Sequence, residues 1–564
     1  MPHEVETSSH WGTYLVDIDD NGHVIGTRPH TDDPDSAPAI ANVSGAQHAR
    51  ARVARPTLRR RWLENGPGPD DHRGSPDDEY VEVDWPTALD LLADELDRVR
   101  ATFGNEAIFG GSYGWASAGR FHHAQSQLHR FLNRIGGYTR SVNDYSRGTS
   151  MVMQPYVVGK QGDLALRARR AGATTRIVSL SAQRDDALAD VGAEWIGVMP
   201  GTDTAVMLSL IHTHGFGSMG DFGVGFERVP VPFFPQGTNP VAGFIPCARI
   251  SDMLLHPGEE FPYDGSTLRY PDVKLASWAG GNPFHHHQDL RRLTRALGRL
   301  DTFVVDEMHW TPTAKHADIV LPVATTLERD DIAAGVGDAR LRVSRRAVAP
   351  YAEAREEFAI FTELARRLKA DFDEGLSAAD WLRKIYEDWR ATDVSPPAPP
   401  FDEFWEVGGV PLRQRPYDDP VFSDFRVDPD LHPLQTPSGR IELYSATIAS
   451  YGLRDVPGHA AWIEPTQWWR SPQATTYDLH LLCNQPSHRL HSQQDMGAAS
   501  RSTKVGGREP IRLHPADAAV RGLRDGDVAR VRSAQGTLLA GVVVTGAMSP
   551  GVAQMHTGAW CDPI

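Results

Sequence analysis

Strand-like and helix-like patterns alternate through the middle of this 564-residue chain. Short apolar runs predict strands at 176–180, 195–198, 273–279 and 302–305, and helical periodicity appears at 164–171, 204–212 and 288–299. Such alternation predicts an α/β fold whose parallel sheets are covered by helices. Because ligands of these folds bind at the carboxyl ends of the strands, the polar loops 179–186, 200–203, 279–288 and 306–309 are candidate site segments.

The densest group of polar and aromatic residues runs from Gly110 to Met151, after a short predicted strand at 107–109. It contains Tyr113 and Trp115, a helix rich in His and Gln, and a turn that ends at Ser146. Two polar-aromatic turns that flank a helix indicate one wall of a binding site.

The two ends of the chain have different patterns. Residues 11–27 predict a hairpin that turns at Asn21-Gly22, and 85–101 predict a helix with Pro86 in its first turn. From about 477 onward strands dominate, so we expect residues 477–564 to form a separate β-rich domain, a barrel. Residues 1–476 then form several discontinuous α/β domains, with the Pro-rich segment 393–420 as a surface connection.

Composition excludes several classes of protein. The formal net charge of −16 argues against nucleic acid or an anionic membrane as the main partner. Three scattered cysteines with no CxxC pair offer no ligand set for an iron–sulfur cluster or a structural zinc. The N-terminal residues have no secretory signal pattern, and no apolar stretch reaches the about 20 residues of a membrane span. We therefore expect a cytoplasmic protein.

Three short motifs suggest other functions. Residues 110–114 match the G-x-S-x-G nucleophile motif, and an α/β-hydrolase using Ser112 is an alternative, but residues 115–119 delay the helix that must follow the serine. Residues 215–220 match G-x-G-x-x-G, yet the Gly- and Pro-rich sequence that follows favours a loop over a nucleotide-binding helix. Residues 285–287 are three consecutive histidines, which cannot all face one metal ion and so favour contacts to a polar ligand.

Eight long stretches carry a family resemblance. They are SHWGTY at 9–14, GGSYGWASAGRFHHAQ at 110–125, GGYTRSVNDYSRGTS at 136–150, AEWIGVMPGTDTAVML at 193–208, ASWAGGNPFHHHQDL at 276–290, VVDEMHWTPTAKHADIVLPVATTLERDD at 304–331, CNQPSHRLHSQ at 483–493 and REPIRLHPADAAVRGLRDGDVARV at 508–531. In this order, the chain resembles the dimethyl sulfoxide reductase family of molybdopterin oxidoreductases, and most closely its biotin sulfoxide reductase branch.

The resemblance implies a cofactor and a reaction. The family binds molybdenum through two molybdopterin guanine dinucleotides, and the members without an N-terminal cysteine cluster have no iron–sulfur centre. Ser146 corresponds to the protein ligand of the metal, and a serine oxygen suits a high-valent metal. Tyr113 corresponds to the residue that donates a hydrogen bond to the transferred oxygen, and Trp115 to one that packs over the metal. The expected reaction is reduction of a small-molecule sulfoxide, of the biotin or methionine sulfoxide type, or an N-oxide, with electrons from an unidentified donor.

The same resemblance implies a set of residues that contact the two dinucleotides, most of them in polar loops. They are Trp115, Ser117, Ser179, Gly201, Thr202, Asp203, Asn282, His286, Asp306, Arg329, Asn484, Gln485, Arg489 and His491. Guanidinium and imidazole donors suit phosphate and pterin edges. The last four lie in the C-terminal domain, which the resemblance identifies as the dinucleotide-binding domain.

The chain departs from the family by being shorter. Segments that the family carries are absent after Gly159 and after His214, and the chain ends before the last family segment. Loss of a central parallel strand removes hydrogen bonds on both sides and exposes apolar faces. The alternative to an active reductase is therefore an inactive, truncated relative or gene-model fragment that cannot hold the full cofactor.

Overall fold

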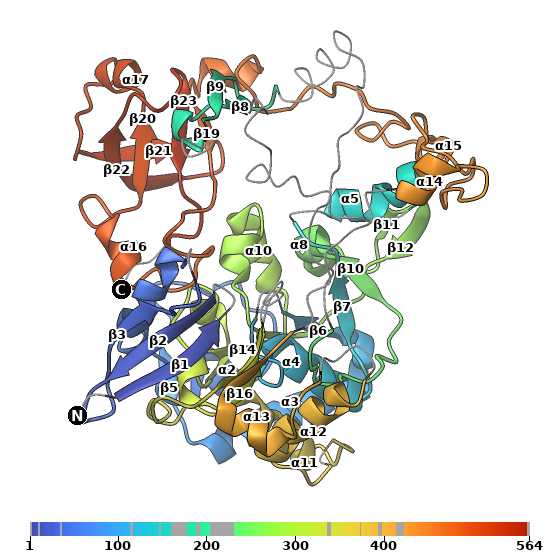
Figure 1. The fold of residues 1–564 in the computed structure, drawn as a ribbon, viewed down its shortest axis with the longest axis vertical. Coiled ribbons are helices and arrows are strands. Elements are labelled where there is room, and N and C mark those ends of the chain that lie inside the picture. Colours follow the sequence, from blue (N-terminus) through green and yellow to red (C-terminus); the bar gives the residue numbers. More distant parts are fainter. Residues whose placement is uncertain are drawn as a thin grey trace.

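The computed structural model describes residues 3–9, 12–33, 36–112, 117–145, 148–159, 178–187, 192–202, 230–334, 340–372, 374–392, 397–412 and 422–560. Two sheets dominate this part of the chain, an eight-stranded sheet flanked by helices and a five-stranded sheet built from C-terminal residues (Figure 1).

The eight-stranded sheet is the α/β core that the sequence predicts. Its order is β10 (Phe244–Pro246), β7 (Thr139–Val142), β6 (Ile108–Gly111), β13 (Leu275–Ala279), β14 (Thr302–Glu307), β15 (Ile319–Pro322), β4 (Thr57–Arg59) and β5 (Tyr80–Glu82). The first six strands are parallel, and β4 and β5 add an antiparallel edge. The expected strands at 107–109, 273–279 and 302–305 are confirmed as β6, β13 and β14.

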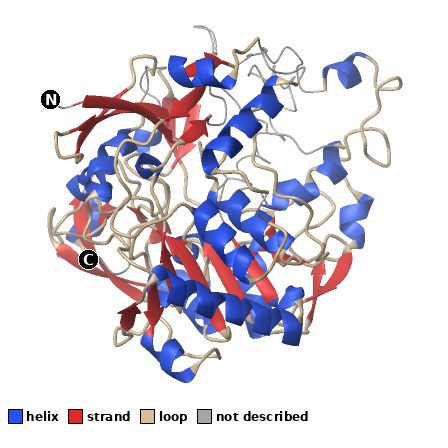
Figure 2. Cartoon of the chain, turned by 90° about the horizontal axis from the view of Figure 1, so that it is seen from below, coloured by secondary structure: helices blue, strands red, loops and turns tan. Residues whose placement is uncertain are grey.

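Successive residues of the central strands enter two different cores. Ile108 and Leu275 pack with helices α3 (Trp85–Phe103), α4 (Ala124–Arg134) and α11 (Glu357–Arg367). Their neighbours Phe109 and Ala276 pack on the opposite side with α8 (Ile250–Leu255) and α10 (Leu290–Leu297). This pattern follows from the alternation of side chains along a strand, and it places helices on both faces of the sheet (Figure 2).

Capping residues fix the predicted helix and hairpin near the N-terminus. The Asp84 carboxylate accepts a hydrogen bond from the Thr87 amide at 2.9 Å, which starts α3 where the sequence predicts. β1 (His3–Ser9), β2 (Gly12–Ile18) and β3 (Val24–Pro29) form an antiparallel sheet. The Asp19 carboxylate accepts hydrogen bonds from the amides of Asn21 and His23, which confirms the turn at Asn21-Gly22.

The described part of the predicted surface connection 393–420 has regular structure. Its described residues include α13 (Phe401–Val407) and β18 (Gly409–Pro411), and β18 pairs with β17 (Arg340–Ser344), which also pairs with β16 (Asp331–Ala333). Phe404 is fully buried and stacks on Tyr386 of α12 (Ala378–Arg390). Prolines around 395–400 obscure the short aromatic helix in the sequence pattern.

The predicted strands at 176–180 and 195–198 form, but they do not join the main sheet. They are β8 (Val178–Ser181) and β9 (Glu194–Gly197), an isolated parallel pair among the described strands. Their loop is attached to the C-terminal sheet, where the Arg184 amide donates to the Ala547 carbonyl at 2.8 Å (Figure 1). The predicted helices at 164–171 and 204–212 lie outside the described residues.

The predicted C-terminal β-rich unit is present as a five-stranded sheet. Its order is β19 (His480–Leu482), β23 (Val552–Met555), β20 (Pro510–Leu513), β22 (Thr537–Val544) and β21 (Val528–Arg532). β21 and β22 form an antiparallel hairpin that turns at residues 534–536.

Shorter elements complete the described part of the chain. They are α1 (Val43–Gln47), α2 (Arg60–Asn65), α5 (Gly148–Met153), α6 (Pro155–Val158), α9 (Pro283–His286), α14 (Ser423–Val427), α15 (Ala446–Ser450), α16 (Ala498–Ser502), α17 (Pro515–Ala519), β11 (Glu260–Tyr263) and β12 (Ser266–Arg269).

A buried ion cluster ties the antiparallel edge to the parallel sheet. Asp318, directly before β15, accepts hydrogen bonds from Arg59 Nε at 2.9 Å and from Arg73 Nη2 at 2.8 Å. It also accepts one from the Phe303 amide of β14 at 2.8 Å. The side chains of Asp318 and both arginines are almost completely buried.

Replacing Asp318 with Asn should lower the free energy of unfolding by about 3–5 kcal/mol, because it leaves two buried guanidinium groups without their shared counterion. Urea unfolding of the purified protein measures this change. Asp402→Asn breaks the exposed pair with Arg383 and should leave the free energy of unfolding nearly unchanged, because solvent screens exposed ion pairs. Similar effects of the two variants would contradict the structural role of Asp318.

Candidate functional site

The carboxyl ends of the parallel strands gather several of the predicted site residues at one edge of the sheet. Asp306 is the second-last residue of strand β14, Asn282 and His286 follow β13, and Arg329 follows β15. In the sequence, Tyr113 and Trp115 follow β6, and Ser146 follows β7. These three residues and Asp203 lie outside the described residues.

Two glycines let the β6 strand pack closely against its neighbours before it reaches this edge. A Cβ atom on Gly111 would lie 2.0 Å from the Trp278 ring, and one on Gly110 would lie 2.5 Å from the Tyr138 ring. Gly110 and Gly111, the first two residues of the G-x-S-x-G match, are therefore required for packing, independently of any function of the residues that follow. Ser112 is buried, and its hydroxyl donates to the Ala279 carbonyl at 2.5 Å, which does not favour a nucleophile.

The loop after β13 joins the α/β sheet to the C-terminal unit. Asn282 is buried, donates to Ser492 Oγ at 3.2 Å and accepts a hydrogen bond from the Thr313 hydroxyl. The His286 and His491 rings meet edge to face with their centroids 4.7 Å apart. His286 and His491, two predicted cofactor contacts from distant parts of the sequence, thus lie together.

The three consecutive histidines have different surroundings. Burial lowers the pKa of His285 and His287 to about 4 and that of His286 to about 3, so all three imidazoles are neutral near pH 7. His286 faces His491, whereas His287 forms a short hydrogen bond with the Tyr145 hydroxyl. The buried His285 Nε2 has no hydrogen-bond partner within the protein.

Burial raises the pKa of two adjacent carboxyl groups at the end of β14. Burial, with Glu357 and Glu307 nearby, raises the pKa of Asp306 well above its usual range, and both carboxyl oxygens lack a partner within the protein. Burial also raises the pKa of Glu307 to about 7, although the Met308 amide donates to its carboxylate at 2.8 Å. A protonated Asp306 carboxyl is both a donor and an acceptor.

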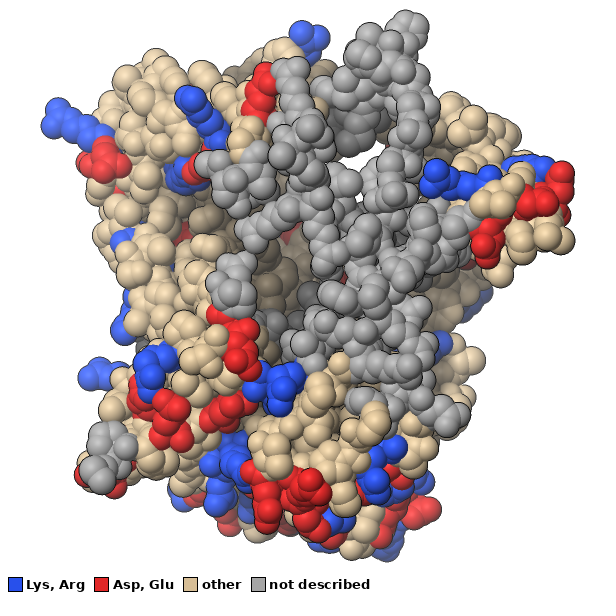
Figure 3. Space-filling model, viewed as in Figure 1, with Lys and Arg blue, Asp and Glu red and all other residues tan. Residues whose placement is uncertain are grey.

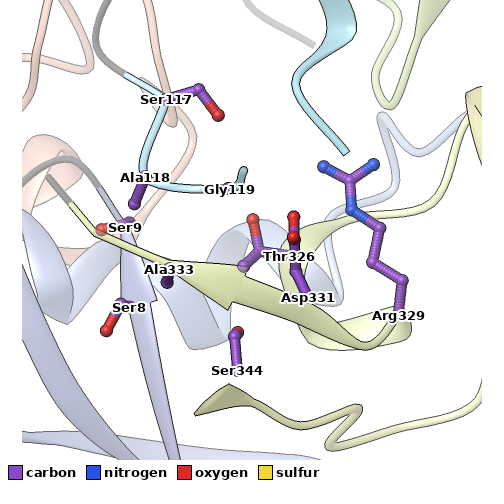
Figure 4. Close-up of a pocket in the computed structure, with 10 residues that line it drawn as sticks. All are labelled: Ser8, Ser9, Ser117, Ala118, Gly119, Thr326, Arg329, Asp331, Ala333 and Ser344. Carbon is purple, nitrogen blue, oxygen red and sulfur yellow. The ribbon is translucent and has the colours of Figure 1, made fainter. Parts of the chain in front are cut away.

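Ser117 and Arg329 line a small cavity of about 70 Å³ between the β1 edge and the loop after β15 (Figure 4). Arg329 Nη1 donates to Glu357 at 2.7 Å and its Nη2 to the His122 carbonyl at 3.0 Å, while its Nε has no partner within the protein. The chain approaches closely at Gly119, where a Cβ atom would lie 2.3 Å from Asp331 Oδ2.

The C-terminal candidates divide into a structural residue and three that frame an exposed loop. All the N–H groups of Arg489 are directed to protein acceptors, which include Glu509 at 3.1 Å and the Thr557 carbonyl at 2.9 Å. This arrangement makes Arg489 a support for the loop. Gln485 is exposed and bonds to both the backbone and the ring of His491, and the Asn484 side chain accepts from Gln554 at 2.7 Å.

The candidates on the β8–β9 pair are not brought to the β14 edge by described contacts. Ser179 lies on β8, Gly201 adopts a left-handed φ of 77°, and the Thr202 hydroxyl donates to the Met199 carbonyl at 2.6 Å. This pair is attached to the C-terminal sheet through the 182–187 loop, so these residues belong with that unit. The sequence pattern assigns all the predicted contacts to one site, whereas the structure places some of them at the edge of the eight-stranded sheet and others beside the C-terminal sheet.

Two residues of this region carry features that the sequence reasoning missed. His122 is buried with neither ring nitrogen bonded within the protein, and burial together with Arg329 lowers its pKa well below the usual range. The Tyr145 hydroxyl bonds to Cys247 and to His287, which lie in two other loops. The His-rich stretch and the Asn-Asp-Tyr turn were visible in the sequence, but nothing in them revealed which side chain meets which.

Comparisons with known proteins agree on one family. Family models match at residues 52–162 and 216–367 (Molybdopterin oxidoreductase), 7–48 (Molybdopterin oxidoreductase N-terminal domain) and 479–563 (Molydopterin dinucleotide binding domain). The chain is 34% identical to a biotin sulfoxide reductase of Cereibacter sphaeroides, over 96% of this chain and 92% of that protein. The chain belongs to the dimethyl sulfoxide reductase family of molybdopterin oxidoreductases.

Other members of this family and its fold are also similar. A dimethyl sulfoxide/trimethylamine N-oxide reductase of Rhodobacter capsulatus is 32% identical, over 99% of this chain and 87% of that protein. The structure of acetylene hydratase from Pelobacter acetylenicus matches with a TM-score of 0.70 at 16% identity, over 99% of this chain and 93% of that chain, and shows the fold alone.

This family member is shortened internally. Its alignment with the biotin sulfoxide reductase covers 688 residues although the chain has 564, so more than a hundred residues of that relative lie opposite gaps in this chain. Residues 163–215 separate the two parts of the main family match, and the missing segments predicted after Gly159 and His214 lie within a few residues of the two ends of this interval.

The described residues fit a molybdopterin cofactor. Asp306 offers unbonded carboxyl oxygens, His285 an unbonded Nε2 and Trp278 an unbonded indole Nε1, all buried in the protein near the carboxyl ends of β13 and β14. Buried polar atoms without protein partners indicate a ligand that bonds to them.

Among the described residues no cluster of three or more His, Cys, Asp or Glu side chains is suited to hold a metal ion alone. No described helix is long and apolar enough to cross a bilayer.

Glu307 should make the protein less stable as the pH rises from about 4.5 to about 7, the ordinary and folded-state pKa values of its carboxyl group. In this interval the unfolded chain has released the proton that the folded protein retains, so the free energy of unfolding falls, by up to about 3 kcal/mol. Urea unfolding of the wild type and of Glu307→Gln across this range measures the difference. Parallel pH curves for the two proteins would show that Glu307 titrates normally.

Proposed function

We propose that this protein is a molybdenum enzyme that reduces a sulfoxide of the biotin or methionine sulfoxide type, or an N-oxide, by oxygen-atom transfer. The observation that carries the proposal is the match of nearly the whole chain to enzymes named as sulfoxide and N-oxide reductases. The buried unbonded side chains at the carboxyl edge support it, because they suit a large polar cofactor.

We propose molybdenum bis(molybdopterin guanine dinucleotide) as the cofactor, with Ser146 as the protein ligand and no iron–sulfur cluster. When bound, the cofactor supplies two-electron oxygen-atom transfer. Tyr113 donates a hydrogen bond to the substrate oxygen, and Trp115 shapes the pocket beside it. The protonated Asp306 and the neutral His285 hold polar edges of the cofactor, because each presents an unbonded buried atom.

We assign the remaining cofactor contacts to two groups. Ser117, Asn282, His286 and Arg329 act from the α/β region, and Ser179, Gly201, Thr202, Asp203, Asn484, Gln485 and His491 act with the C-terminal unit. Arg489 acts indirectly, by holding the loop that carries His491. We propose residues 477–564 as the dinucleotide-binding domain and 1–476 as the catalytic region.

The proposed partners are a small-molecule substrate and an electron donor that the chain does not identify. The formal charge of −16 supports the absence of a nucleic-acid or anionic-membrane partner. On the face shown in Figure 3, the described Lys and Arg side chains are interspersed with Asp and Glu over the lower half. The cytoplasmic location stays a prediction.

Purified protein should contain molybdenum and pterin in a ratio of about one to two, as the bis-pterin cofactor requires. With a reduced dye as electron donor it should reduce methionine sulfoxide, and Ser146→Ala should lower kcat by about 100-fold or more, because the metal loses its protein ligand. Metal analysis and a dye-oxidation assay measure these outcomes.

Ser450→Ala is the matched control, since the Ser450 hydroxyl bonds to the Thr447 carbonyl on exposed helix α15. It should leave both cofactor content and kcat unchanged. Protein without molybdenum and pterin would contradict the proposal and identify an inactive relative. Full activity in Ser146→Ala would refute the role of Ser146.

A further inference from the structure

Three loops at the carboxyl edge of the sheet meet at the hydroxyl group of Tyr145. This hydroxyl donates to the Cys247 carbonyl oxygen at 2.9 Å and forms a second, short hydrogen bond with His287 Nδ1. The Tyr145 and His287 rings also meet edge to face, with their centroids 5.3 Å apart. One side chain therefore bonds the loops that follow β7, β10 and β13.

The strand order gives this junction its significance. In the sequence of strands β10-β7-β6-β13, β6 lies between β7 and β13. The bond between Tyr145 and His287 therefore joins the loops on either side of β6, the strand that leads to Tyr113. Tyr145 is the residue directly before Ser146 in the chain.

Both sides of the junction are themselves fixed. The Cys247 side chain is buried, and the His287 ring lies edge-on to buried Trp278 with centroids 6.0 Å apart. On the loop that carries Tyr145, Asn143 adopts a left-handed φ of 63° and donates from Nδ2 to the Tyr263 hydroxyl at 2.9 Å. Because Asn tolerates this conformation better than most residues, the loop is held at Asn143 as well as at Tyr145.

We propose that Tyr145, held by Cys247 and His287, is a positioning residue for Ser146, because it fixes the β7 loop directly before Ser146 relative to the loops after β10 and β13. The proposal rests on the proposed function, in which Ser146 binds the metal. A ligand on a loop needs such support, because changing a residue that orients a metal ligand typically costs about 10- to 100-fold in metal affinity or activity.

The first test compares Tyr145→Phe with a matched control. Tyr145→Phe keeps the ring and removes both hydrogen bonds. Tyr386→Phe removes another buried tyrosine hydroxyl, which donates to the Pro399 carbonyl at 2.8 Å in the core of α12 and α13. In cofactor-loaded protein, Tyr145→Phe should lower kcat by about 10- to 100-fold with KM nearly unchanged, as expected for a displaced reacting group, and should shift the visible absorption of the metal centre. Tyr386→Phe should change neither.

The His287 side of the junction provides a rescue test. His287→Asn places an amide near the position of Nδ1 and should retain most of kcat, whereas His287→Leu should lose as much as Tyr145→Phe. Combining His287→Leu with Tyr145→Phe should add little further loss, because both changes break the same junction. Equal losses in the Asn and Leu variants, or full additivity, would overturn the proposal.

Hydrogen exchange in protein prepared without cofactor tests the junction independently of the metal. Tyr145→Phe should increase exchange at residues 143–153 several-fold, and Tyr386→Phe should not. Unchanged exchange together with wild-type kcat and spectrum in Tyr145→Phe would refute the positioning role. If the exchange increases but the wild-type protein binds no molybdenum, the junction stands and the proposed function fails.

Discussion

The common direction of six neighbouring strands is the constraint on which this structure depends. Parallel strands end at the same edge, so loops that are up to two hundred residues apart in the chain are brought together there. The two buried cores that sandwich the sheet fix the strands and therefore the positions of these loops. The Asp318 cluster attaches the antiparallel edge to the same framework, so the β14–β15 side of the site has the same rigid base.

The carboxyl edge of the sheet also contains buried polar atoms that have no hydrogen-bond partner within the protein. Asp306, His122 and Trp278 all bury polar atoms that bond to no other protein group. Each such atom costs free energy when it is left unpaired. Their position at the ends of adjacent strands and in the loop between β6 and α4 indicates that ligand binding, rather than stability, maintains these side chains.

Much of the fold could be predicted from the sequence because periodicity and capping are local. The strands β6, β13 and β14, helix α3 and the hairpin at Asn21-Gly22 follow from patterns within a few residues. Which sheet a strand joins is not local. β8 and β9 have the pattern of core strands, but their partners are each other and a loop near Ala547, more than three hundred residues away.

The site was predicted by loop position and family resemblance. The engagement of Arg489 with Glu509, and the junction at Tyr145, depend on side chains that meet only after folding. The roles of Tyr113, Trp115 and Ser146 stay predictions.

The β8–β9 pair also bears on how the chain folds during synthesis. The register of the pair places Val178, Leu180 and Ile196 on one face, and all three are exposed. The residues that hold the loop of this pair, around Ala547, leave the ribosome near the end of translation. During most of its synthesis the nascent chain therefore carries an unsupported apolar strand pair, a species prone to aggregation.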